Sequence, residues 1–402
     1  MPVGLPESPE LKPVTGIRLG TASAGISNPG RQDLLVIEAA EGTHGAAVFT
    51  RNRFCAAPVT VAREHLADTA PRFCVINAGN ANAGTGQPGL EAARETCESM
   101  AALAACPAEA VLPFSTGVIG ERLPVDRIRR GLPDAYANLD ADNWLAAAGA
   151  IMTTDTVPKG ITIEFEVGGQ PATLTGIVKG AGMIRPDMAT LLAYIATDAA
   201  VEPGILQACL SAAVNRSFNR ISIDGDTSTN DACLLLATGT GQASICRDNQ
   251  DVFQTALNEA CEYLARAVVR DGEGANRFVT VHVSAGSSEK ECLRIAYAIA
   301  ESPLVKTALF AGDPNWGRIL AAIGRSGPVD LDIESVSIAI DDCHIVANGG
   351  LVDNYSETAA QAIMAGPEYT LHVMLGRGEE EARVWTCDLS HEYVRINAEY
   401  RT

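Results

Sequence analysis

The sequence is poor in aromatic and in basic residues. Phe, Trp and Tyr make up 5% of its 402 residues, and 30 Lys and Arg stand against 49 Asp and Glu, which gives a net charge of −19. Nucleic acids and anionic membrane surfaces bind clustered cationic side chains, so this composition predicts neither as a partner. The sequence also lacks an apolar run of about 18 residues, so no segment is expected to span a membrane. A small acidic ligand remains compatible with the composition, because one local Lys or Arg can bind it.

Several common motifs are missing as well. The sequence contains no GxxxxGK[ST], no complete GxGxxG and no GxSxG, which disfavours the usual nucleotide-binding loops and an α/β-hydrolase serine. Its 11 cysteines include no CxxC, and its six histidines show no zinc spacing, so no metal site is expected. The cysteines lie mostly among apolar residues, which favours buried, reduced thiols. The first 14 residues hold acidic residues and four prolines instead of a signal sequence, so a cytoplasmic location is expected.

Strand-like and helix-like patterns alternate along the chain. Strands are expected at Ala47 to Thr50, Phe73 to Ile76, Thr173 to Val178, Leu191 to Thr197, Ile221 to Ile223, Ala232 to Ala237, Phe278 to Val283, Val336 to Ile340, Tyr369 to Leu375 and Arg383 to Cys387. Helices are expected at Leu90 to Cys106, Asn143 to Ile151, Val201 to Phe218, Val252 to Val268 and Cys292 to Ala300. These patterns predict an α/β protein with sheets layered against helices. The length suggests two or three domains or lobes, and two lobes divided near Ala189 and Thr190 is the simplest partition.

The junction between Ala189 and Thr190 is the strongest candidate for chemistry. A loop rich in glycine, KGAGMIRPDMA, stops at Thr190, and an apolar run begins there. A threonine held against the carbonyl of Ala189 could cut its own peptide bond, and the new terminal amine could then serve as the base for its hydroxyl. Taken alone, such a pattern more often indicates a turn that leads into a buried strand.

Three further segments carry candidate site residues. In FSTGVIG, Thr116 and the amide of Gly117 could form an oxyanion hole, although most such triplets are turns. Thr153 and Thr154 in MTTDTVPK could cap a helix or cradle a ligand. Glu273 in RDGEGAN could face solvent, or a rigid turn could present its carboxylate to a cationic substrate.

The acidic segment DGDTSTND, from Asp224 to Asp231, resembles a calcium loop only in part. Its sixth position is Thr229 where an EF-hand has glycine, and its twelfth is Leu235 where an EF-hand has glutamate. An EF-hand is therefore excluded, and a polar turn with local hydrogen bonds is favoured over a metal site.

Taken together, these segments strongly resemble the ornithine acetyltransferases of arginine biosynthesis. The resemblance runs in uninterrupted order from about Gly16 to Thr402 and is carried by KGAGMIRPDMATLLAYIATDA, FSTGVIGERLP, NAGNANAGTG, MTTDTVPK, DGDTSTND, VRDGEGA, SPLVKTALFAGDPNWGRI and CDLSHEYVRINAEYRT. Members of that family are glutamate N-acetyltransferases, often also amino-acid N-acetyltransferases. One departure is Arg185-Pro186-Asp187, where many relatives have a smaller or neutral residue before the proline and Asn after it.

The resemblance implies a precursor that cleaves itself. Cleavage before Thr190 would give an α chain of residues 1–189 and a β chain of residues 190–402, which assemble as an α2β2 heterotetramer. The implied fold is an αβα-layered one shared with self-processing aminopeptidases. No permanently bound cofactor is implied, and the resemblance leaves open whether acetyl-CoA serves as a second donor.

The resemblance also implies roles for individual residues. Thr190 would be the nucleophile, with Thr116 and Gly117 as the oxyanion hole. Substrate contacts would fall on Thr153 or Thr154, Lys179, Thr190, Glu273, Asn397 and Thr402. The run of threonines does not align uniquely, so the choice between Thr153 and Thr154 stays open.

The chemistry of these groups suits N-acetylornithine, the acetyl donor that the resemblance implies together with glutamate as acceptor. An α-amine has a pKa of about 7.7–8.0, so a good fraction of it is neutral near physiological pH and can accept the Thr190 proton. Lys179 can bind the α-carboxylate of N-acetylornithine, and Glu273 can bind its δ-ammonium group. The alternatives are an amidohydrolase or aminopeptidase of the same architecture, with water as acceptor, and a non-enzymatic amino-acid-binding protein.

The last residues are expected to take part in the site. Ala382 to Leu389 has the pattern of a strand, which would hold the tail from Asn397 to Thr402 against the pocket. The common alternative for terminal residues is a frayed end. We expect the tail to close the pocket.

Overall fold

The computed structural model describes residues 2–27, 30–185, 191–327 and 331–399. These residues divide into two compact units. The larger unit contains residues 6–219 and 226–268, and the smaller contains residues 2–5, 220–225 and 269–399. Among the helices of the described ranges, none has the length and apolar character needed to cross a membrane.

The larger unit is built on two sheets. The four-stranded sheet has the order β1 (Ile17–Ala22), β2 (Leu34–Ala39), β4 (Phe73–Asn80), β5 (Val111–Val118). The five-stranded sheet has the order β3 (His44–Phe49), β11 (Ala232–Ala237), β8 (Leu192–Thr197), β7 (Gln170–Lys179), β6 (Lys159–Val167), and β9 (Ala200–Val201) pairs separately with β12 (Ser244–Ile245). The helices of this unit are α1 (Ala57–Asp68), α2 (Gly86–Ala104), α3 (Val125–Ala137), α4 (Trp144–Ala150), α5 (Pro203–Arg216) and most of α6 (Gln250–Arg270).

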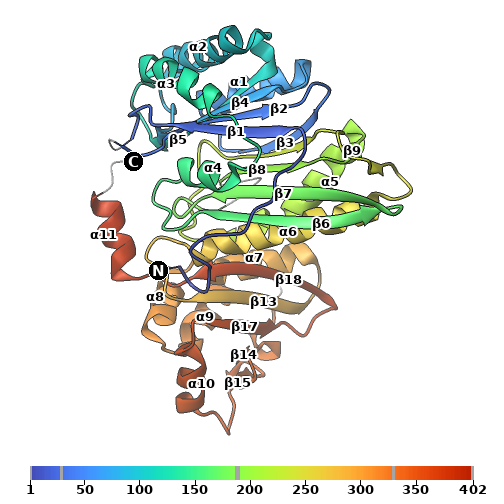
Figure 1. Cartoon of the computed structure of the whole chain (residues 1–402). Coiled ribbons are helices and arrows are strands. Elements are labelled where there is room, and N and C mark those ends of the chain that lie inside the picture. The colour runs from blue at the N-terminus through green and yellow to red at the C-terminus, as the bar shows by residue number, and fades with distance from the viewer. Residues whose placement is uncertain (1, 28–29, 186–190, 328–330, 400–402) are drawn as a thin grey trace. The chain divides into compact units, whose positions relative to one another are not determined.

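The two sheets pack face to face, and helices cover their outer faces (Figure 1). Apolar side chains from both sheets form the core between them, including Ile76 and Phe114 from one sheet and Tyr194 and Leu234 from the other. Helices α1 to α3 lie over the four-stranded sheet, while α5 and α6 lie against the five-stranded sheet. Every residue of β8 and of β11 is buried, as expected for strands covered on both faces.

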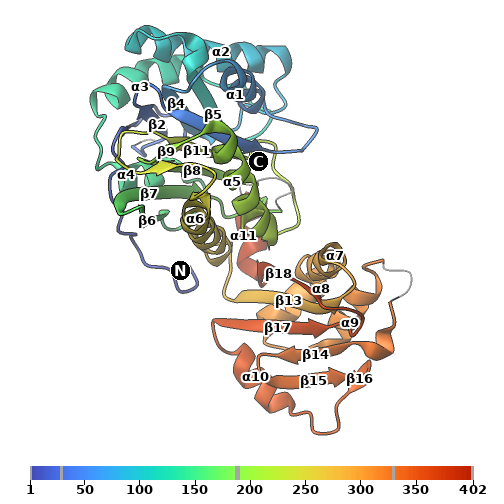
Figure 2. The same cartoon turned by 90° about the vertical axis from the view of Figure 1, so that its right-hand side faces the viewer.

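The smaller unit contains one seven-stranded sheet with helices packed against it (Figure 2). Its strand order is β10 (Ile221–Ser222), β18 (Glu380–Cys387), β13 (Phe278–Gly286), β17 (Glu368–Met374), β14 (Ser337–Ile340), β15 (Cys343–Ala347), β16 (Gly350–Leu351). Its helices are α7 (Glu289–Ala300), α8 (Pro303–Ala311), α9 (Trp316–Gly324), α10 (Glu357–Met364) and α11 (His391–Glu399). Short 3-10 turns occur at Ala108–Ala110 in the larger unit, at Phe218–Arg220 on the boundary between residues of the two units, and at Ile333–Ser335 in the smaller unit.

The structure confirms the α/β class and the layering of helices against sheets, with a pair of sheets as the β layer of the larger unit. The expected strand Ala232 to Ala237 is β11 residue for residue, and the expected helix Val252 to Val268 is α6 with short extensions. The segment from Asn77 to Asn80, which follows the expected strand Phe73 to Ile76, is the end of β4. Parallel pairing with β5 holds this Asn- and Gly-containing segment extended, against the local preference of these residues for turns.

The boundary between the compact units differs from the expected lobe boundary near Ala189 and Thr190. Strand β7, before that junction, pairs antiparallel with β8, after it, so that Lys179 lies opposite Leu192. Both sides of the junction therefore belong to one sheet of the larger unit, whereas the longest segment of the smaller unit begins at residue 269. Division of the chain into residues 1–189 and 190–402 by cleavage stays a prediction, since Ala189 and Thr190 lie outside the described residues.

Candidate active site

The structure places the expected site residues in two groups. The larger unit contains Thr116, Gly117, Thr153, Thr154 and Lys179, and the smaller unit contains Glu273 and Asn397. Ala189, Thr190 and Thr402 lie outside the described residues.

Thr116 and Gly117 lie on β5, where this strand comes very close to β4. Gly117 has a φ of 131°, and a Cβ added to it would lie 2.3 Å from the carbonyl carbon of Gly79. Only glycine fits such a backbone conformation at such a distance. The glycine that we expected to supply an oxyanion donor is therefore also required by the packing of two strands.

Lys179 is the last residue of β7, and its ammonium group reaches Thr116. The Nζ atom of Lys179 donates a hydrogen bond to Thr116 Oγ1 at 3.2 Å, and each residue is only 8% exposed. An ammonium group has no acceptor, so the threonine oxygen accepts and its own proton is left to donate elsewhere. The structure thus brings together a buried cation and a hydroxyl donor that lie 63 residues apart in the sequence.

The loop after β7 turns sharply before it reaches residue 186. Met183 has a φ of 56°, a left-handed conformation that is uncommon for a residue with a side chain. Ile184 forms an isolated bridge with Thr227, whose hydroxyl donates to the carbonyl of Arg185 at 2.9 Å. The strained end of this loop is therefore fastened to the segment Asp226 to Asp231.

Thr153 and Thr154 are half-buried in the turn between α4 and β6. The N–H of Thr153 donates to Asp155 Oδ2 at 2.9 Å, and its carbonyl accepts a hydrogen bond from Arg31 Nη1 at 3.2 Å. The backbone of Thr153 is thus held on both sides, and the C-cap residue of α4 is Ile151. The choice between Thr153 and Thr154 as a substrate contact stays open.

Asp155 belongs to this site and was missed by the sequence analysis. Its Oδ1 atom accepts hydrogen bonds from Lys159 Nζ and from the N–H of Gly180, both at 2.7 Å. Burial alone would raise the pKa of the Asp155 carboxyl, but the ammonium groups of Lys159 and Lys179 hold that pKa well below its usual range. Lys159 lies four residues from Asp155, but Gly180 lies 25 residues away, so the local sequence did not indicate this group.

Asn230 is a second residue that the sequence analysis missed. Its side-chain amide donates to the carbonyls of Ala81 at 2.6 Å and of Ser115 at 2.9 Å. Ser115 in turn donates through its hydroxyl to Asn77 Oδ1 at 2.6 Å. The polar segment that we expected to be a turn therefore supports the backbone next to Thr116, which accounts for its many hydrogen-bonding residues.

A small cavity of about 30 Å³ lies at the Lys179–Thr116 contact. Its described lining includes Thr116, Lys179, Gly180, Gly182, Met183, Ile184, Leu191, Leu192, Ser228, Asn230 and Asp231. Leu191 directly follows Thr190 in the sequence. The cavity is therefore bordered by the residue next to the predicted nucleophile and by one of the two predicted oxyanion donors.

In the smaller unit, Glu273 and Asn397 are in direct contact. Asn397 Nδ2 donates to Glu273 Oε2 at 2.7 Å, and Glu273 is 8% exposed. Asn397 lies on α11, a helix that the sequence analysis did not predict. The hydroxyl of Ser390, just before α11, donates to the carbonyl of Gly274 at 2.7 Å and fastens the start of the helix to the Glu273 turn.

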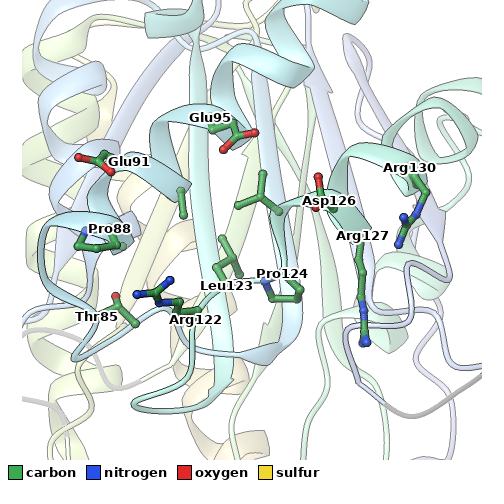
Figure 3. Close-up of a pocket in the computed structure, with 13 residues that line it drawn as sticks. Thr85, Pro88, Glu91, Glu95, Arg122, Leu123, Pro124, Asp126, Arg127 and Arg130 are labelled. Atoms are coloured by element: carbon green, nitrogen blue, oxygen red, sulfur yellow. The ribbon is translucent and has the colours of Figure 1, made fainter.

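A wider cavity, of about 690 Å³, lies between α2 and α3 (Figure 3). Its charged lining comprises Arg122, Arg127, Arg130, Glu91, Glu95 and Asp126. None of the expected site residues line it. Arg129 bridges Glu95 and Asp126, so the carboxylates on this surface are partly neutralised by the protein itself.

The described lining of the small cavity contains no cysteine, and two buried cysteines of the larger unit are poor nucleophiles. Burial raises the pKa of Cys233 to about 12 and raises that of Cys261 well above its usual value. A thiol with such a pKa has almost no thiolate near neutral pH. Among the side chains of the described ranges, no three His, Cys, Asp or Glu residues are grouped so that they could hold a metal ion.

Comparisons with known proteins place these residues in a family. Residues 18–402 match the model of the ArgJ family. The chain is 56% identical over 395 residues to the arginine biosynthesis bifunctional protein ArgJ of Methylococcus capsulatus, covering 98% of this chain and 97% of that protein. It is 53% identical over 406 residues to the protein of the same name from Pseudomonas syringae pv. tomato, with both chains fully covered. Among solved structures, the ornithine acetyltransferase of Mycobacterium tuberculosis complexed with ornithine is 34% identical, covers 46% of this chain and 98% of its own, and gives a TM-score of 0.40.

The family match includes every segment that contributes to the two groups of site residues. Thr116, Gly117 and Lys179 lie within the matched range, as do Glu273 and Asn397. High identity over the full length leaves no part of the chain outside the comparison. This chain belongs to the ArgJ family of enzymes.

Proposed function

We propose that this chain is an acetyltransferase of arginine biosynthesis that moves the acetyl group of N2-acetylornithine to glutamate. The observation that carries the proposal is the hydrogen bond from Lys179 Nζ to Thr116 Oγ1, at 3.2 Å. It joins a cation suited to an amino-acid carboxylate with a hydroxyl suited to an oxyanion, beside a cavity that Leu191 borders. In acyl transfer between amino acids, the cation can bind the carboxylate of the substrate and the hydroxyl can stabilise the oxyanion.

The first reaction of the chain is its own cleavage. The hydroxyl oxygen of Thr190 attacks the carbonyl carbon of Ala189, and the peptide C–N bond breaks as the Thr190 nitrogen takes up a proton. Water then hydrolyses the ester, which leaves a carboxylate on Ala189 and a free amino group on Thr190. Thr116 and Gly117 stabilise the oxyanion of each step.

Acetyl transfer then proceeds in two halves. The amino group of Thr190 takes the hydroxyl proton while the oxygen attacks the acetyl carbonyl of N-acetylornithine. The amide C–N bond breaks, the amino group of ornithine receives the proton, and ornithine leaves an acetyl ester on Thr190. The neutral amine of glutamate attacks this ester, N-acetylglutamate leaves, and the Thr190 hydroxyl is restored.

Recognition of the substrates rests on charged and polar side chains. Glu273, oriented by Asn397, binds the δ-ammonium group of N-acetylornithine, and Lys179 contributes to binding of the α-carboxylate. Thr153 or Thr154 and the terminal Thr402 add polar contacts. These roles follow from the resemblance of the motifs, and the buried state of Lys179 and Glu273 supports them, because a buried charge binds an opposite charge strongly.

A second activity and an assembly belong to the same proposal. The relatives are named as bifunctional proteins, which supports acetyl-CoA as a further donor for acetylation of glutamate. We assign the chain an α2β2 assembly of its two cleavage products. No permanently bound cofactor takes part in the reactions above.

The test is whether ornithine release depends on the acceptor. Purified protein is incubated with N-acetylornithine, with and without glutamate, and ornithine and N-acetylglutamate are both quantified. We expect ornithine release to accelerate strongly with glutamate and to equal the N-acetylglutamate formed. Equal release in both mixtures, with free acetate as the product, would identify an amidohydrolase instead. A third mixture with acetyl-CoA as the only donor tests the second activity.

A further inference from the structure

Asp155 has no role in the mechanism above, although it lies directly beside the site. Its side chain is 0% exposed and forms an ion pair with Lys159, whose side chain is 1% exposed. The Oδ1 atom accepts from Lys159 and from the N–H of Gly180, and Oδ2 accepts from the N–H of Thr153. A buried carboxylate keeps its charge only where such donors replace water.

We infer that Asp155 is a positioning residue of the oxyanion site. Asp155 holds Lys179 in place, and the ammonium group of Lys179 then directs the hydroxyl proton of Thr116 toward the reacting carbonyl. The inference rests on the proposed function, because it assigns a role within that chemistry. It extends that function by making Lys179 necessary for self-cleavage as well as for substrate binding.

Two contacts connect Asp155 with Lys179. The first is the hydrogen bond from the N–H of Gly180 to Asp155, at 2.7 Å, which fixes the peptide that immediately follows Lys179. The second is electrostatic, since the ammonium group of Lys179 stabilises the Asp155 carboxylate. The end of β7 is thus held both by its backbone and by its charge.

The ammonium group of Lys179 lines the cavity beside Thr116. Asp155 and Lys159 lie 2.7 Å apart and form a neutral pair, and the buried carboxylate of Asp231 lines the same cavity as Lys179. A single positive charge in a buried environment stabilises a single negative charge strongly. A tetrahedral oxyanion carries that charge, and it forms in self-cleavage as well as in both halves of acetyl transfer.

The direction of the Lys179–Thr116 hydrogen bond determines where the threonine can donate. Because the ammonium group only donates, Thr116 Oγ1 accepts, and the hydroxyl proton must point away from Lys179. A side chain that served only to bind the carboxylate of N-acetylornithine would have no effect on self-cleavage, which involves no added substrate. The two reactions therefore separate the two roles of Lys179.

The experiment replaces the buried pair as a whole. The double variant Asp155→Asn/Lys159→Gln removes one negative and one positive charge, so that neither member of the pair is left buried without the other. Self-cleavage of freshly synthesised chain is followed on denaturing gels, and kcat and KM are measured on the cleaved fraction. We expect the cleavage rate and kcat both to fall about tenfold or more, because an oxyanion forms in both reactions. KM for N-acetylornithine should rise as well, since Lys179 also contributes to substrate binding.

Asp198→Asn is the matched control. Asp198 is also a buried aspartate of the larger unit, but it accepts the N–H of Thr173, toward the opposite end of β7 from Lys179. We expect normal cleavage and normal kcat from this control. A folded double variant with unchanged cleavage and unchanged kcat, or with a raised KM as the only effect, overturns the inference.

A second variant decides the question if the double variant does not fold, as judged by thermal unfolding. Lys179→Met leaves the Asp155–Lys159 pair in place, and we expect it to slow self-cleavage and kcat together. Normal self-cleavage in Lys179→Met overturns the inference. The wild-type chain, measured in parallel, distinguishes failure of this inference from failure of the proposed function. If the wild-type chain cleaves itself but does not transfer acetyl to glutamate, the proposed acetyl transfer is wrong. The cleavage rates of the variants still decide the role of Asp155 in that case.

Discussion

Gly117 and Gly79 face each other across β5 and β4, so closely that a Cβ on Gly117 would lie 2.3 Å from the carbonyl carbon of Gly79. Gly117→Ala should therefore push the two strands apart. We expect it to lower the free energy of unfolding by about 2 kcal/mol or more, from overpacking and from the unfavourable φ. Urea unfolding of the uncut Thr190→Ala chain, with and without the change, measures this loss.

Gly120→Ala provides the matched control for that measurement. Gly120 has a φ of 83°, but a Cβ added there would meet no atom within 4 Å. It therefore carries the strain of the left-handed backbone without the clash. Equal losses of stability in the two variants would show that the close approach of β4 and β5 contributes nothing to the effect of Gly117→Ala.

Cleavage of the chain should depend on the Thr190 hydroxyl. We expect purified wild-type protein to consist of two fragments, with Thr190 as the first residue of the second, as N-terminal sequencing will report. Thr190→Ala should stay intact and inactive, because it lacks the oxygen that attacks Ala189. A Thr190→Ala chain that is cut at the same bond would point to an outside protease.

Thr116→Ala should slow acetyl transfer without weakening substrate binding. Loss of one oxyanion donor typically costs a factor of about 10²–10³ in kcat. KM should change little, since the donor acts on charge that exists only in the transition state. Thr116→Ser retains the hydroxyl and should keep most of the activity, so equal losses in both variants would argue against an oxyanion role.

Acetyl transfer should proceed through a covalent intermediate. Incubation with N-acetylornithine alone should add one acetyl group to the fragment that begins at Thr190, which mass spectrometry of the intact fragment detects. Initial rates at varied concentrations of both substrates should give parallel double-reciprocal lines, because the first product leaves before glutamate binds. Intersecting lines would indicate direct transfer within a ternary complex.

Asn397→Ala should impair binding of N-acetylornithine. Asn397 donates to the Glu273 carboxylate at 2.7 Å, and a hydrogen bond to a charged group is worth about 1.5–3 kcal/mol. We expect KM for N-acetylornithine to rise about tenfold, with self-cleavage unaffected. Glu399→Gln, which changes a side chain of the same helix that pairs with Arg395, should leave KM unchanged. An unchanged KM in Asn397→Ala would remove α11 from the site.

Parts of the fold and of the site could be predicted because their signals are local. The fully apolar run Ala232–Ala237 and the periodic pattern of α6 need no information from the rest of the chain. Asp155 and Asn230 could not be assigned, because what matters about them is which distant groups they meet. Asn230 and Ser115, for example, lie 115 residues apart, and no pattern within either segment indicates the contact. The roles of Glu273 and Asn397 came from the family resemblance, and the contact between them became visible only in the structure.

The pairing of β7 with β8 gives the proposed cut a lasting thermodynamic consequence. The strands on either side of the junction are neighbours inside one buried sheet, so cleavage would leave the native contacts in place while removing the covalent link between them. After unfolding, the two pieces would have to find each other again by diffusion, and the newly made terminus could not be rejoined. An intact chain can fold and unfold repeatedly. A cleaved chain would not refold readily after unfolding, so its stability would depend on the kinetic barrier to unfolding. The broken bond is then a permanent record that the chain once reached its native state.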